Sequence, residues 1–253
     1  QEGAGSSQSN RYFPAGNGIT YVASAGDYGA GVQDLPAPAG TTPATRTHRM
    51  EAAADHPMIV QVGGTALKHD ARGQVVGETV WGHGPNSGVN GDGTASAKRG
   101  SGGGVSQYVG RPAYQTNSLY VQAFLKNHGA EIAGPFAGNR LGPDVSLMST
   151  PGLPVLHQTS TAGFTWESEI IGTSLATPLF AGALAIAAQA RALKGKPPLS
   201  SLRTLGLLYQ APSTVFFDVT EGNNGYPAEP GFDLASGLGS VRVAPLVRYL
   251  ASA

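Results

Sequence analysis

The stretch Gly172-Thr173-Ser174-Leu175-Ala176-Thr177-Pro178 opens an apolar run that closes at Lys194-Gly195. This run predicts a helix that begins near Ser174. Its first three turns are almost entirely Ala, Leu, Ile, Phe and Gly, so we expect the helix to be buried on all sides. Pro178 suits the first turn, where its missing N–H is not needed. The most apolar part, Leu175 to Ala190, is shorter than the roughly 20 residues of a membrane span, so we expect no membrane anchor.

Ser174 is a candidate nucleophile. A serine placed where a strand or loop turns into a helix has its hydroxyl exposed at the helix N-terminus. Free N–H groups and the positive end of the helix dipole favour a developing oxyanion there. Gly172 permits the close approach of a substrate backbone. The alternative is that Thr173 or Ser174 only caps the helix.

Three short apolar runs predict buried parallel strands. They are Ile19–Ala23, Met58–Thr65 and Val145–Met148, and the stretch 66–81 is hairpin-like. Asp27 follows the first run closely, at the carboxyl end where open α/β sheets place their chemistry. Because the 253 residues show no internal repeat and no domain boundary, they predict a single α/β domain.

Composition narrows the class of function. Sixteen basic and sixteen acidic side chains cancel and form no basic tract, which argues against nucleic acid or an anionic membrane as a partner. Cysteine is absent, which excludes a disulfide, a thiolate nucleophile and a cysteine-ligated metal. A low charged fraction of 13%, with 37 Gly and 18 Pro, suits a turn-rich secreted protein, and the N-terminal Gln1 resembles a cleavage product.

Several ordered segments resemble the sedolisin (serine-carboxyl) peptidases over nearly the whole chain. The string at 172–178 matches a nucleophile signature that sedolisins share with subtilisins. Ser24-Ala25-Gly26-Asp27 resembles the sedolisin S-x-G-D motif, and R-L-G-P-D-V-S at 140–146 resembles its R-x-x-P-D-V-S strand. VGGT at 62–65 and GGGVS at 102–106 are lesser matches. The resemblance implies a subtilisin-like, doubly wound, mostly parallel sheet with a buried central helix after the nucleophile.

Two other classes of serine hydrolase fit less well. Subtilisins need a histidine in an H-G-T context, and none of the six histidines stands in one (His48, His56, His69, His83, His128, His157). A lipase-type hydrolase would place its serine in G-x-S-x-G, whereas this chain has G-T-S-L-A. The resemblance therefore favours sedolisins.

The sedolisin resemblance implies hydrolysis of polypeptides through an acyl-enzyme on Ser174. A Glu oriented by a neighbouring Asp takes the serine proton, and the Ser174 N–H and Asp27 hold the oxyanion. A carboxyl group donates a hydrogen bond only in its neutral form, which acidic pH favours. We therefore expect an endopeptidase, or a tripeptidyl peptidase, that acts at acidic pH. The alternative role for Asp27 is a turn or N-cap.

The family's Glu/Asp pair lies upstream of the S-x-G-D strand, and no E-x-x-x-D spacing precedes Gly18. Glu51 and Asp55 have i, i+4 spacing, but we expect a solvated turn there. Glu167 and Glu169 lead in to the nucleophile without supplying the base. We therefore interpret residues 1–253 as the C-terminal portion of one catalytic domain, with a companion N-terminal chain that carries the pair. An inactive fragment and a pseudoenzyme that binds peptides in the same cleft stay open as alternatives.

The last segment resembles the paired halves of the sedolisin calcium site. Asp218 and Asp233 offer carboxylates from two ends of a loop rich in Gly, Asn and Pro, and Ca²⁺ prefers six to eight hard oxygen ligands. By resemblance, the backbone carbonyls of Val219, Glu229 and Gly231 complete the protein ligands. Glu229 stands where the family usually has Gly. The alternative is a pair of Asx-type turns.

Overall fold

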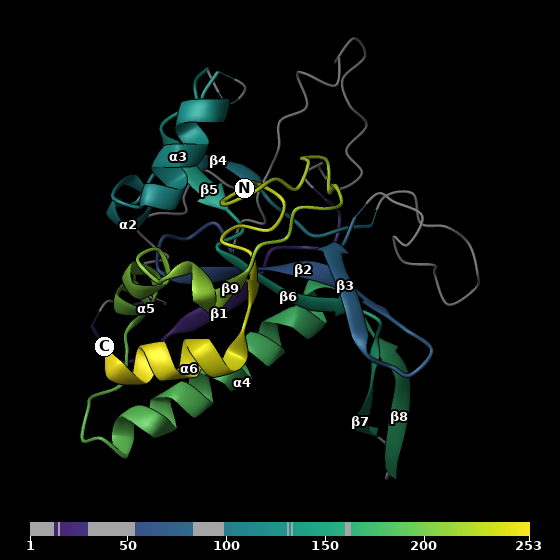
Figure 1. The fold of residues 1–253 in the computed structure, drawn as a ribbon. Coiled ribbons are helices and arrows are strands. Elements are labelled where there is room, and N and C mark those ends of the chain that lie inside the picture. Colours follow the sequence, from purple (N-terminus) through teal and green to yellow (C-terminus); the bar gives the residue numbers. More distant parts are fainter. Residues whose placement is uncertain are drawn as a thin grey trace.

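The protein is described by a computed structural model that covers residues 13–14, 16–29, 54–82, 99–130, 132, 134–159 and 163–253. Its centre is a mostly parallel sheet with the strand order β1-β2-β6-β10-β9 (Figure 1). The sheet comprises β1 (Tyr21–Ser24), β2 (Ile59–His69), β6 (Val145–Thr150), β10 (Ser240–Val241) and β9 (Phe216–Phe217), with β3 (Val75–Val80) paired to β2. Pairs β1–β2, β2–β6 and β6–β10 are parallel, whereas β9 and β3 pair antiparallel.

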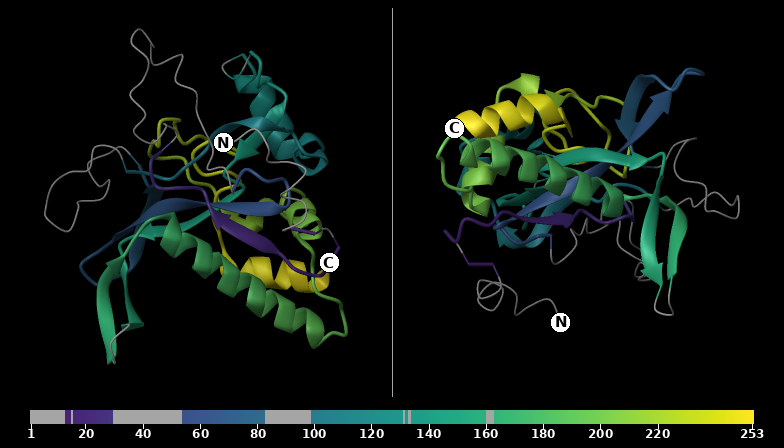
Figure 2. Two further views of the ribbon diagram at one scale, coloured as in Figure 1. Left: turned by 180° about the vertical axis from the view of Figure 1, so that it is seen from behind. Right: turned by 90° about the horizontal axis from the view of Figure 1, so that it is seen from below.

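The three parallel strands and the hairpin expected from the sequence are confirmed, but β1 is half-buried rather than buried. β1, β2 and β6 occupy the three predicted apolar runs, and β2 and β3 form the predicted hairpin. Two further antiparallel pairs flank the sheet: β4 (Gly104–Gly110) with β5 (Asn139–Gly142), and β7 (Leu153–Thr159) with β8 (Gly163–Ile170). The last pair projects from the body as an arm (Figure 2).

The helices cover the sheet. They are α2 (Ala113–Thr116), α3 (Leu119–His128), α4 (Thr173–Ala192), α5 (Ser201–Leu208) and α6 (Val243–Ser252), with a short 3-10 helix at Ser213–Val215. α4 runs beneath β1, β2 and β6, and α6 lies alongside it (Figure 1). Leu175, Ala176, Phe180, Ala183 and Ala187 of α4 are buried in the main core.

The expectation that α4 is buried on all sides is wrong. Its opposite face is exposed at Pro178, Gly182, Ala185, Ile186 and Gln189. The helix is long and apolar enough to cross a membrane by length and composition, yet a helix that packs beneath a sheet passes the same test. The apolar pattern of α4 indicates positions that favour burial, but several of these positions stay exposed among the described residues.

The position of Pro178 also differs from the expectation. α4 begins at Thr173, so Pro178 is the sixth helical residue and lies in the second turn. Proline has no N–H to donate, so the carbonyl of Ser174, four residues earlier, lacks the usual i+4 hydrogen bond. The Thr177 hydroxyl donates to the Thr173 carbonyl at 2.7 Å in the same region.

The R-L-G-P-D-V-S segment has a structural role. The guanidinium of Arg140, completely buried, donates to the Asp144 carboxylate at 2.6 Å and to the carbonyl of Ile59 at 2.8 Å. Asp144 also accepts the Gln61 N–H at 2.7 Å and the Tyr209 hydroxyl at 2.7 Å. This buried ion pair joins β2, β5, β6 and the end of α5, and so fixes the sheet that carries the candidate site. Removal of one partner of such a pair leaves an uncompensated buried charge.

Candidate active site

Ser174 and Asp27 lie in the same hollow of about 300 Å³. The hollow lies where β1 ends and α4 begins, and Ala23, Ser24, Tyr28 and Thr173 also line it. Ser174 is exposed in the first turn of α4. The structure therefore brings the two predicted catalytic residues together at a helix N-terminus, where the Ser174 N–H has no partner among the described residues and can bind an anion.

Asp27 is held by the first residue of α4. Its Oδ1 accepts the Thr173 N–H at 2.8 Å and the Thr173 hydroxyl at 2.7 Å. Asp27 thus caps α4 from another part of the chain, in place of a cap from Gly172. Sequence reasoning considered Thr173 only as a cap itself and missed this role, although the residue stands inside the nucleophile motif.

Gly172 is required by this contact. Its φ of 89° lies in the region that residues with a Cβ avoid. A Cβ built there would lie 2.5 Å from Asp27 Oδ2 and 2.9 Å from Oδ1. Any larger residue at position 172 would therefore push against the carboxyl group beside the nucleophile.

A glycine loop supports the turn that carries Asp27. The N–H of Gly100 donates to the Asp27 carbonyl at 2.9 Å, and the N–H of Gly102 donates to the Gly26 carbonyl at 2.7 Å. A Cβ on Gly102 would lie 1.7 Å from the carbonyl oxygen of Ala25. The backbone at the start of the GGGVS segment thus lies directly against the S-x-G-D turn.

No base for Ser174 occurs in the described part of the chain. The Ser174 hydroxyl makes no hydrogen bond to a described residue, and Glu167 and Glu169 lie exposed on β8 of the arm. Of the decoy pair, Glu51 lies outside the described residues. Asp55 is buried rather than solvated, and its Oδ2 accepts the Ser106 hydroxyl at 2.7 Å. The expected solvated turn is therefore wrong at Asp55, whose carboxylate is used inside the fold.

Comparison with known proteins gives a consistent family. Kumamolisin from Bacillus sp. is 34% identical over 91% of this chain and 36% of its own length. Sedolisin from Pseudomonas sp. is 30% identical over 94% of this chain and 36% of its own length. The solved structure of Pseudomonas sedolisin, a serine-carboxyl proteinase, superposes with a TM-score of 0.62 at 26% identity. It matches 92% of this chain and 56% of the solved chain. This chain is a member of the sedolisin family.

The family membership confirms the subtilisin-like α/β fold expected from the sequence. A scan against family models found no match. Mouse tripeptidyl-peptidase 1, also related, is 29% identical over 93% of this chain and 38% of its own length. The chain thus spans little more than a third of the length of these curated relatives.

The loop expected to bind calcium by analogy with sedolisins is folded around two aspartates. Asp218 accepts the Gly231 N–H at 3.0 Å, and Asp233 accepts the Glu229 N–H at 3.0 Å. The carbonyls of Val219, Glu229 and Gly231 receive no hydrogen bond from the described residues, although Val219 is completely buried.

Asp233 is a buried carboxylate that lacks a cationic partner among the described residues. Burial raises its pKa to about 6, although the N–H groups of Glu229, Ser236 and Ala235 and the Ser236 hydroxyl stabilise the charge. Two carboxylates and three free carbonyls suit a hard cation. The described residues hold no cluster of three or more His, Cys, Asp or Glu side chains, and the expected site needs only two. The residues therefore fit Ca²⁺.

Glu229 stands where sedolisins usually have Gly, and its side chain has a contact of its own. Its Oε2 lies 2.7 Å from Nε2 of His128, at the end of α3. The His128 ring stacks on Phe124 with 5.0 Å between centroids, and Phe124 meets Phe232 of the loop edge-on at 5.6 Å. The Glu229 side chain is thus engaged with α3, while its carbonyl stays available as a ligand.

Proposed function

We propose that this chain carries the nucleophile of a secreted serine-carboxyl endopeptidase that acts at acidic pH through an acyl-enzyme on Ser174. The observation that carries the proposal is the exposed Ser174 in the first turn of α4, in one hollow with Asp27. Membership of the sedolisin family supports the peptidase class. Polypeptides are the proposed substrates.

In the proposed reaction, Ser174 Oγ forms a bond to the scissile carbonyl carbon and its proton passes to a carboxylate base. The carbonyl π electrons move to the oxygen, which faces the Ser174 N–H at the start of α4. When the tetrahedral intermediate collapses, the C–N bond breaks and the leaving amine takes the proton from the base. Water then cleaves the acyl-enzyme by the same route.

The contacts of Asp27 suggest how it would assist. Its Oδ1 is occupied by two donors of Thr173, so Oδ2 is the oxygen available for a proton. A neutral carboxyl group can donate that proton as a hydrogen bond to the oxyanion, and an ionised one cannot. This requirement supports activity at acidic pH.

The base would come from a companion polypeptide. Ser174 has no hydrogen-bonded base among the described residues, and a serine hydroxyl needs one to become nucleophilic. The proposed companion carries the Glu/Asp pair. Ca²⁺, when bound between Asp218 and Asp233, would supply positive charge that holds the loop together.

Peptide hydrolysis by the native material tests the proposal. Ser174→Ala should lower the hydrolysis of a denatured protein substrate at about pH 4 by at least ~10³-fold, because acylation needs the hydroxyl. Ser213→Ala, at an exposed serine far along the chain from the nucleophile, is the matched control and should leave the rate unchanged. Activity that survives Ser174→Ala would contradict the proposal.

A second candidate is a catalytically silent module that binds peptides in the same hollow. This module is favoured because the Ser174 hydroxyl has no base among the described residues. Binding of the protein substrate without hydrolysis, unchanged in Ser174→Ala, distinguishes this module from the enzyme.

A further inference from the structure

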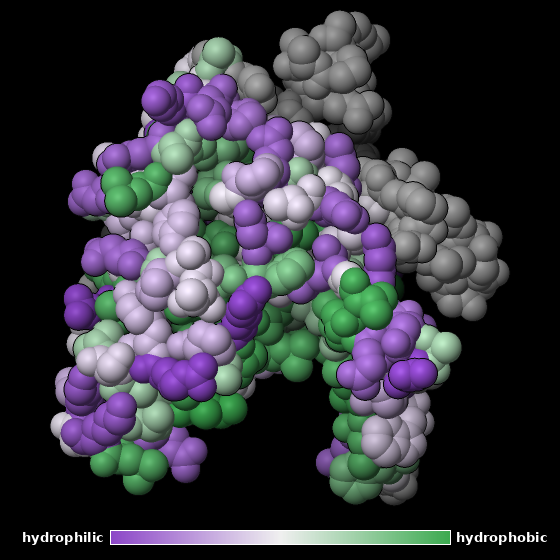
Figure 3. All heavy atoms as spheres, in the orientation of Figure 1, coloured by the Kyte–Doolittle hydropathy of each residue, from purple (hydrophilic) through white to green (hydrophobic). Residues whose placement is uncertain are grey.

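The C-terminal loop, residues 218–234, reaches the glycine loop at residues 100–103 through one buried amide. Asn224 is completely buried, and its side-chain Nδ2 donates to the carbonyl of Ser101 at 2.7 Å. The neighbouring Asn223 is exposed, and hydrophilic side chains are frequent over the face of the molecule that carries this loop (Figure 3). Asn224 therefore differs from the polar residues around it, because its side chain is used inside the fold.

The amide group of Asn224 is fixed in one orientation. Its Oδ1 accepts the Tyr226 N–H at 3.0 Å, and the backbone N–H of Asn224 donates to the Tyr226 carbonyl at 3.2 Å. Since the amide oxygen only accepts and the amide nitrogen only donates, the side chain cannot turn over without losing both of its bonds. The Ser101 carbonyl thus receives a donor whose position the C-terminal loop determines.

Ser101 joins this loop to the central sheet. Its N–H donates to the Trp81 carbonyl at 2.6 Å, and its hydroxyl accepts the Gly64 N–H at 2.9 Å. Gly64 belongs to β2 and Trp81 directly follows β3. The sheet therefore holds the amino side of Ser101, while Asn224 of the C-terminal loop holds its carbonyl side.

One peptide group carries the contact on to the turn that holds Asp27. The Ser101 carbonyl and the Gly102 N–H belong to the same planar peptide unit. The Gly102 N–H donates to the Gly26 carbonyl at 2.7 Å. A hydrogen bond at one end of such a unit polarises the group at its other end. The chain of bonds that begins at Asn224 therefore ends at the residue directly before Asp27.

Packing clamps the glycine loop between the same two parts of the chain. A Cβ on Gly102 would lie 1.7 Å from the Ala25 carbonyl oxygen, and a Cβ on Gly103 would lie 2.1 Å from that of Leu234. Neither gap can hold a side chain, so backbone lies directly against backbone on both sides. A displacement of the C-terminal loop is therefore transmitted through the glycine loop to the turn that carries Asp27.

We propose that Asn224 is a positioning residue for the reaction. Through the Ser101–Gly102 peptide it holds Asp27 where the carboxyl group faces the developing oxyanion. The inference rests on the proposed function, because Asp27 has this role only if Ser174 attacks a carbonyl group. Asn224 does not line the hollow that holds Ser174, so its effect reaches the site through the glycine loop. The C-terminal loop thus supports the active site as well as the fold.

Amide hydrogen exchange of the complete native protein, followed by NMR, tests this support without reference to activity. Asn224→Ala removes the donor to Ser101. The N–H groups of Gly102 and Thr173, which donate to the turn that carries Asp27, should then exchange roughly 10-fold faster than in the wild type. The Thr173 N–H donates to Asp27 Oδ1, so its exchange reports directly on the placement of the carboxyl group.

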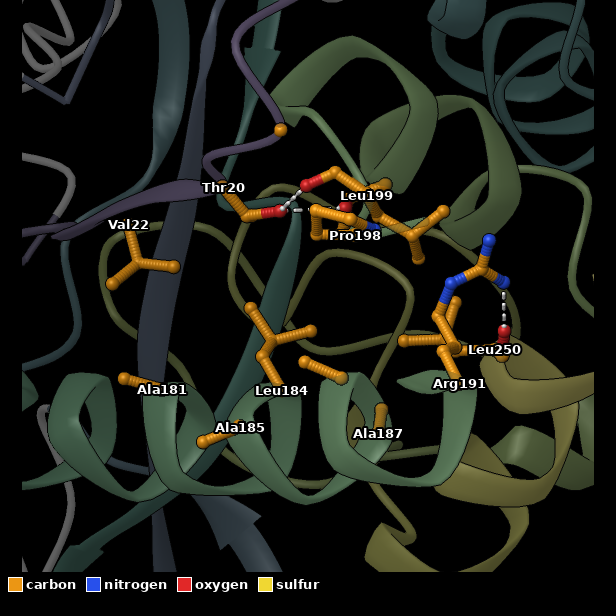
Figure 4. A pocket seen from close by; sticks show the side chains of 13 residues that line it. Thr20, Val22, Ala181, Leu184, Ala185, Ala187, Arg191, Pro198, Leu199 and Leu250 are labelled. Atoms are coloured by element: carbon orange, nitrogen blue, oxygen red, sulfur yellow. Dashed lines mark hydrogen bonds between the residues drawn. The ribbon is translucent and has the colours of Figure 1, made fainter. Parts of the chain in front are cut away.

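Two variants serve as matched controls. Asn223→Ala changes the neighbouring asparagine, which is exposed and whose Oδ1 accepts the Gly225 N–H within the loop. Thr204→Val removes a completely buried hydroxyl that lies 2.8 Å from the Thr20 hydroxyl, near the start of β1 (Figure 4). It controls for the loss of a buried hydrogen bond far from the turn. Both variants should leave the exchange of the two reporter amides within about twofold of the wild type.

Asn224→Asp covers the case in which the alanine variant does not fold. It keeps the shape of asparagine and still accepts the Tyr226 N–H. A neutral carboxyl group can donate to the Ser101 carbonyl, whereas an ionised one repels it. Because burial favours the neutral form, the two reporter amides should exchange as in the wild type at about pH 4 and faster than in the wild type at about pH 7.

A double-mutant cycle tests whether Asn224 acts through Asp27. Asn224→Ala should lower kcat by roughly 10-fold and change KM by less than about twofold, because Asp27 contacts the oxyanion only in the transition state. In an Asp27→Ala background, the same substitution should lower kcat by less than about twofold further.

The outcomes separate this inference from the proposed function. Unchanged exchange of the reporter amides in both Asn224 variants would overturn the inference, as would equal changes in the controls or additive losses in the cycle. Faster exchange at Thr173 in a protein without Ser174-dependent hydrolysis would overturn the proposed function and leave the support of Asp27 by Asn224 in place.

Discussion

At the scale of single residues, the contact between α4 and Asp27 organises the site. Thr173 donates twice to one carboxylate oxygen, and Gly172 leaves the space that the carboxyl group fills. The sequence identified Ser174 and Asp27 through motifs. It could not identify the bond between Thr173 and Asp27, because 146 residues separate the two along the chain.

Gly172→Ala tests this contact. The new Cβ would meet Asp27 Oδ2 at 2.5 Å, and a φ of 89° strains any residue that has a Cβ. We expect a loss of about 2 kcal/mol in the free energy of unfolding, with hydrolysis reduced as Asp27 is displaced. Urea denaturation and rate measurements check both.

Gly182→Ala is the control for that substitution, because no atom lies within 4 Å of the position that its Cβ would take and its φ is ordinary for a helix. It should raise the free energy of unfolding by roughly 0.5–1 kcal/mol through helix propensity. A Gly172→Ala protein as stable and active as the wild type would show that Asp27 is not fitted against position 172.

His56 predicts a dependence of stability on pH. Burial, with a smaller contribution from the charge of Arg140, lowers its pKa below the ordinary 6.5. Its Nδ1 accepts the Met58 N–H at 3.1 Å, which needs the neutral ring. Below pH 6.5 the unfolded chain therefore binds more protons at this position than the folded one, and the free energy of unfolding falls as pH falls.

His56→Asn keeps an acceptor near Met58 and removes the titration. Compared with the wild type, the variant should lose less melting temperature between about pH 7 and about pH 5. His69→Asn, at an exposed position on β2, is the control and should follow the wild type. Equal slopes for wild type and His56→Asn would mean that this histidine does not titrate differently in the two states.

At the scale of elements, the sequence predicted β1, β2, β6 and the start of α4, because each combines a clear apolar pattern with a turn signal. It did not predict α3, α6 or the β7–β8 arm. Phe164 and Trp166 of the arm are largely exposed, so the arm has no buried face to impose a pattern. For α4 the pattern was apolar all round, but the described residues cover only one side.

The C-terminal loop gives a prediction about metal removal. Asp218 and Asp233 hold its two ends, and the loop between them is rich in Gly, Asn and Pro. If Ca²⁺ binds there at about 100 times its dissociation constant, chelation at neutral pH should lower the melting temperature by roughly 5–10 °C. Thermal melts with and without a chelator measure the difference.

Asp218→Asn is the matched variant for chelation. It keeps the shape of an exposed side chain but removes one anionic ligand, so its melting temperature should respond much less to the chelator than that of the wild type. A wild-type protein whose melting temperature ignores the chelator would leave the loop held by its own hydrogen bonds alone.

At the scale of the whole molecule, the described residues form a mostly parallel sheet of the kind found in sedolisin, with the nucleophile at the start of α4. Ser174 and Asp27 lie together where β1 ends and α4 begins, and β1 is an edge strand of the central sheet among the described residues. Motifs predicted the family and the fold. The exposure of one face of α4 among the described residues could not be predicted, because an apolar pattern does not show which positions other elements cover.

The central claim is that Ser174 forms an acyl-enzyme, and trapping of that intermediate tests it most directly. The native protein would be mixed with a peptide ester at about pH 4, quenched with acid and digested for mass spectrometry. The account predicts a mass increase equal to the acyl group on the peptide that contains Ser174, absent in Ser174→Ala. Substrate consumed without an adduct, or an adduct on another residue, would contradict it.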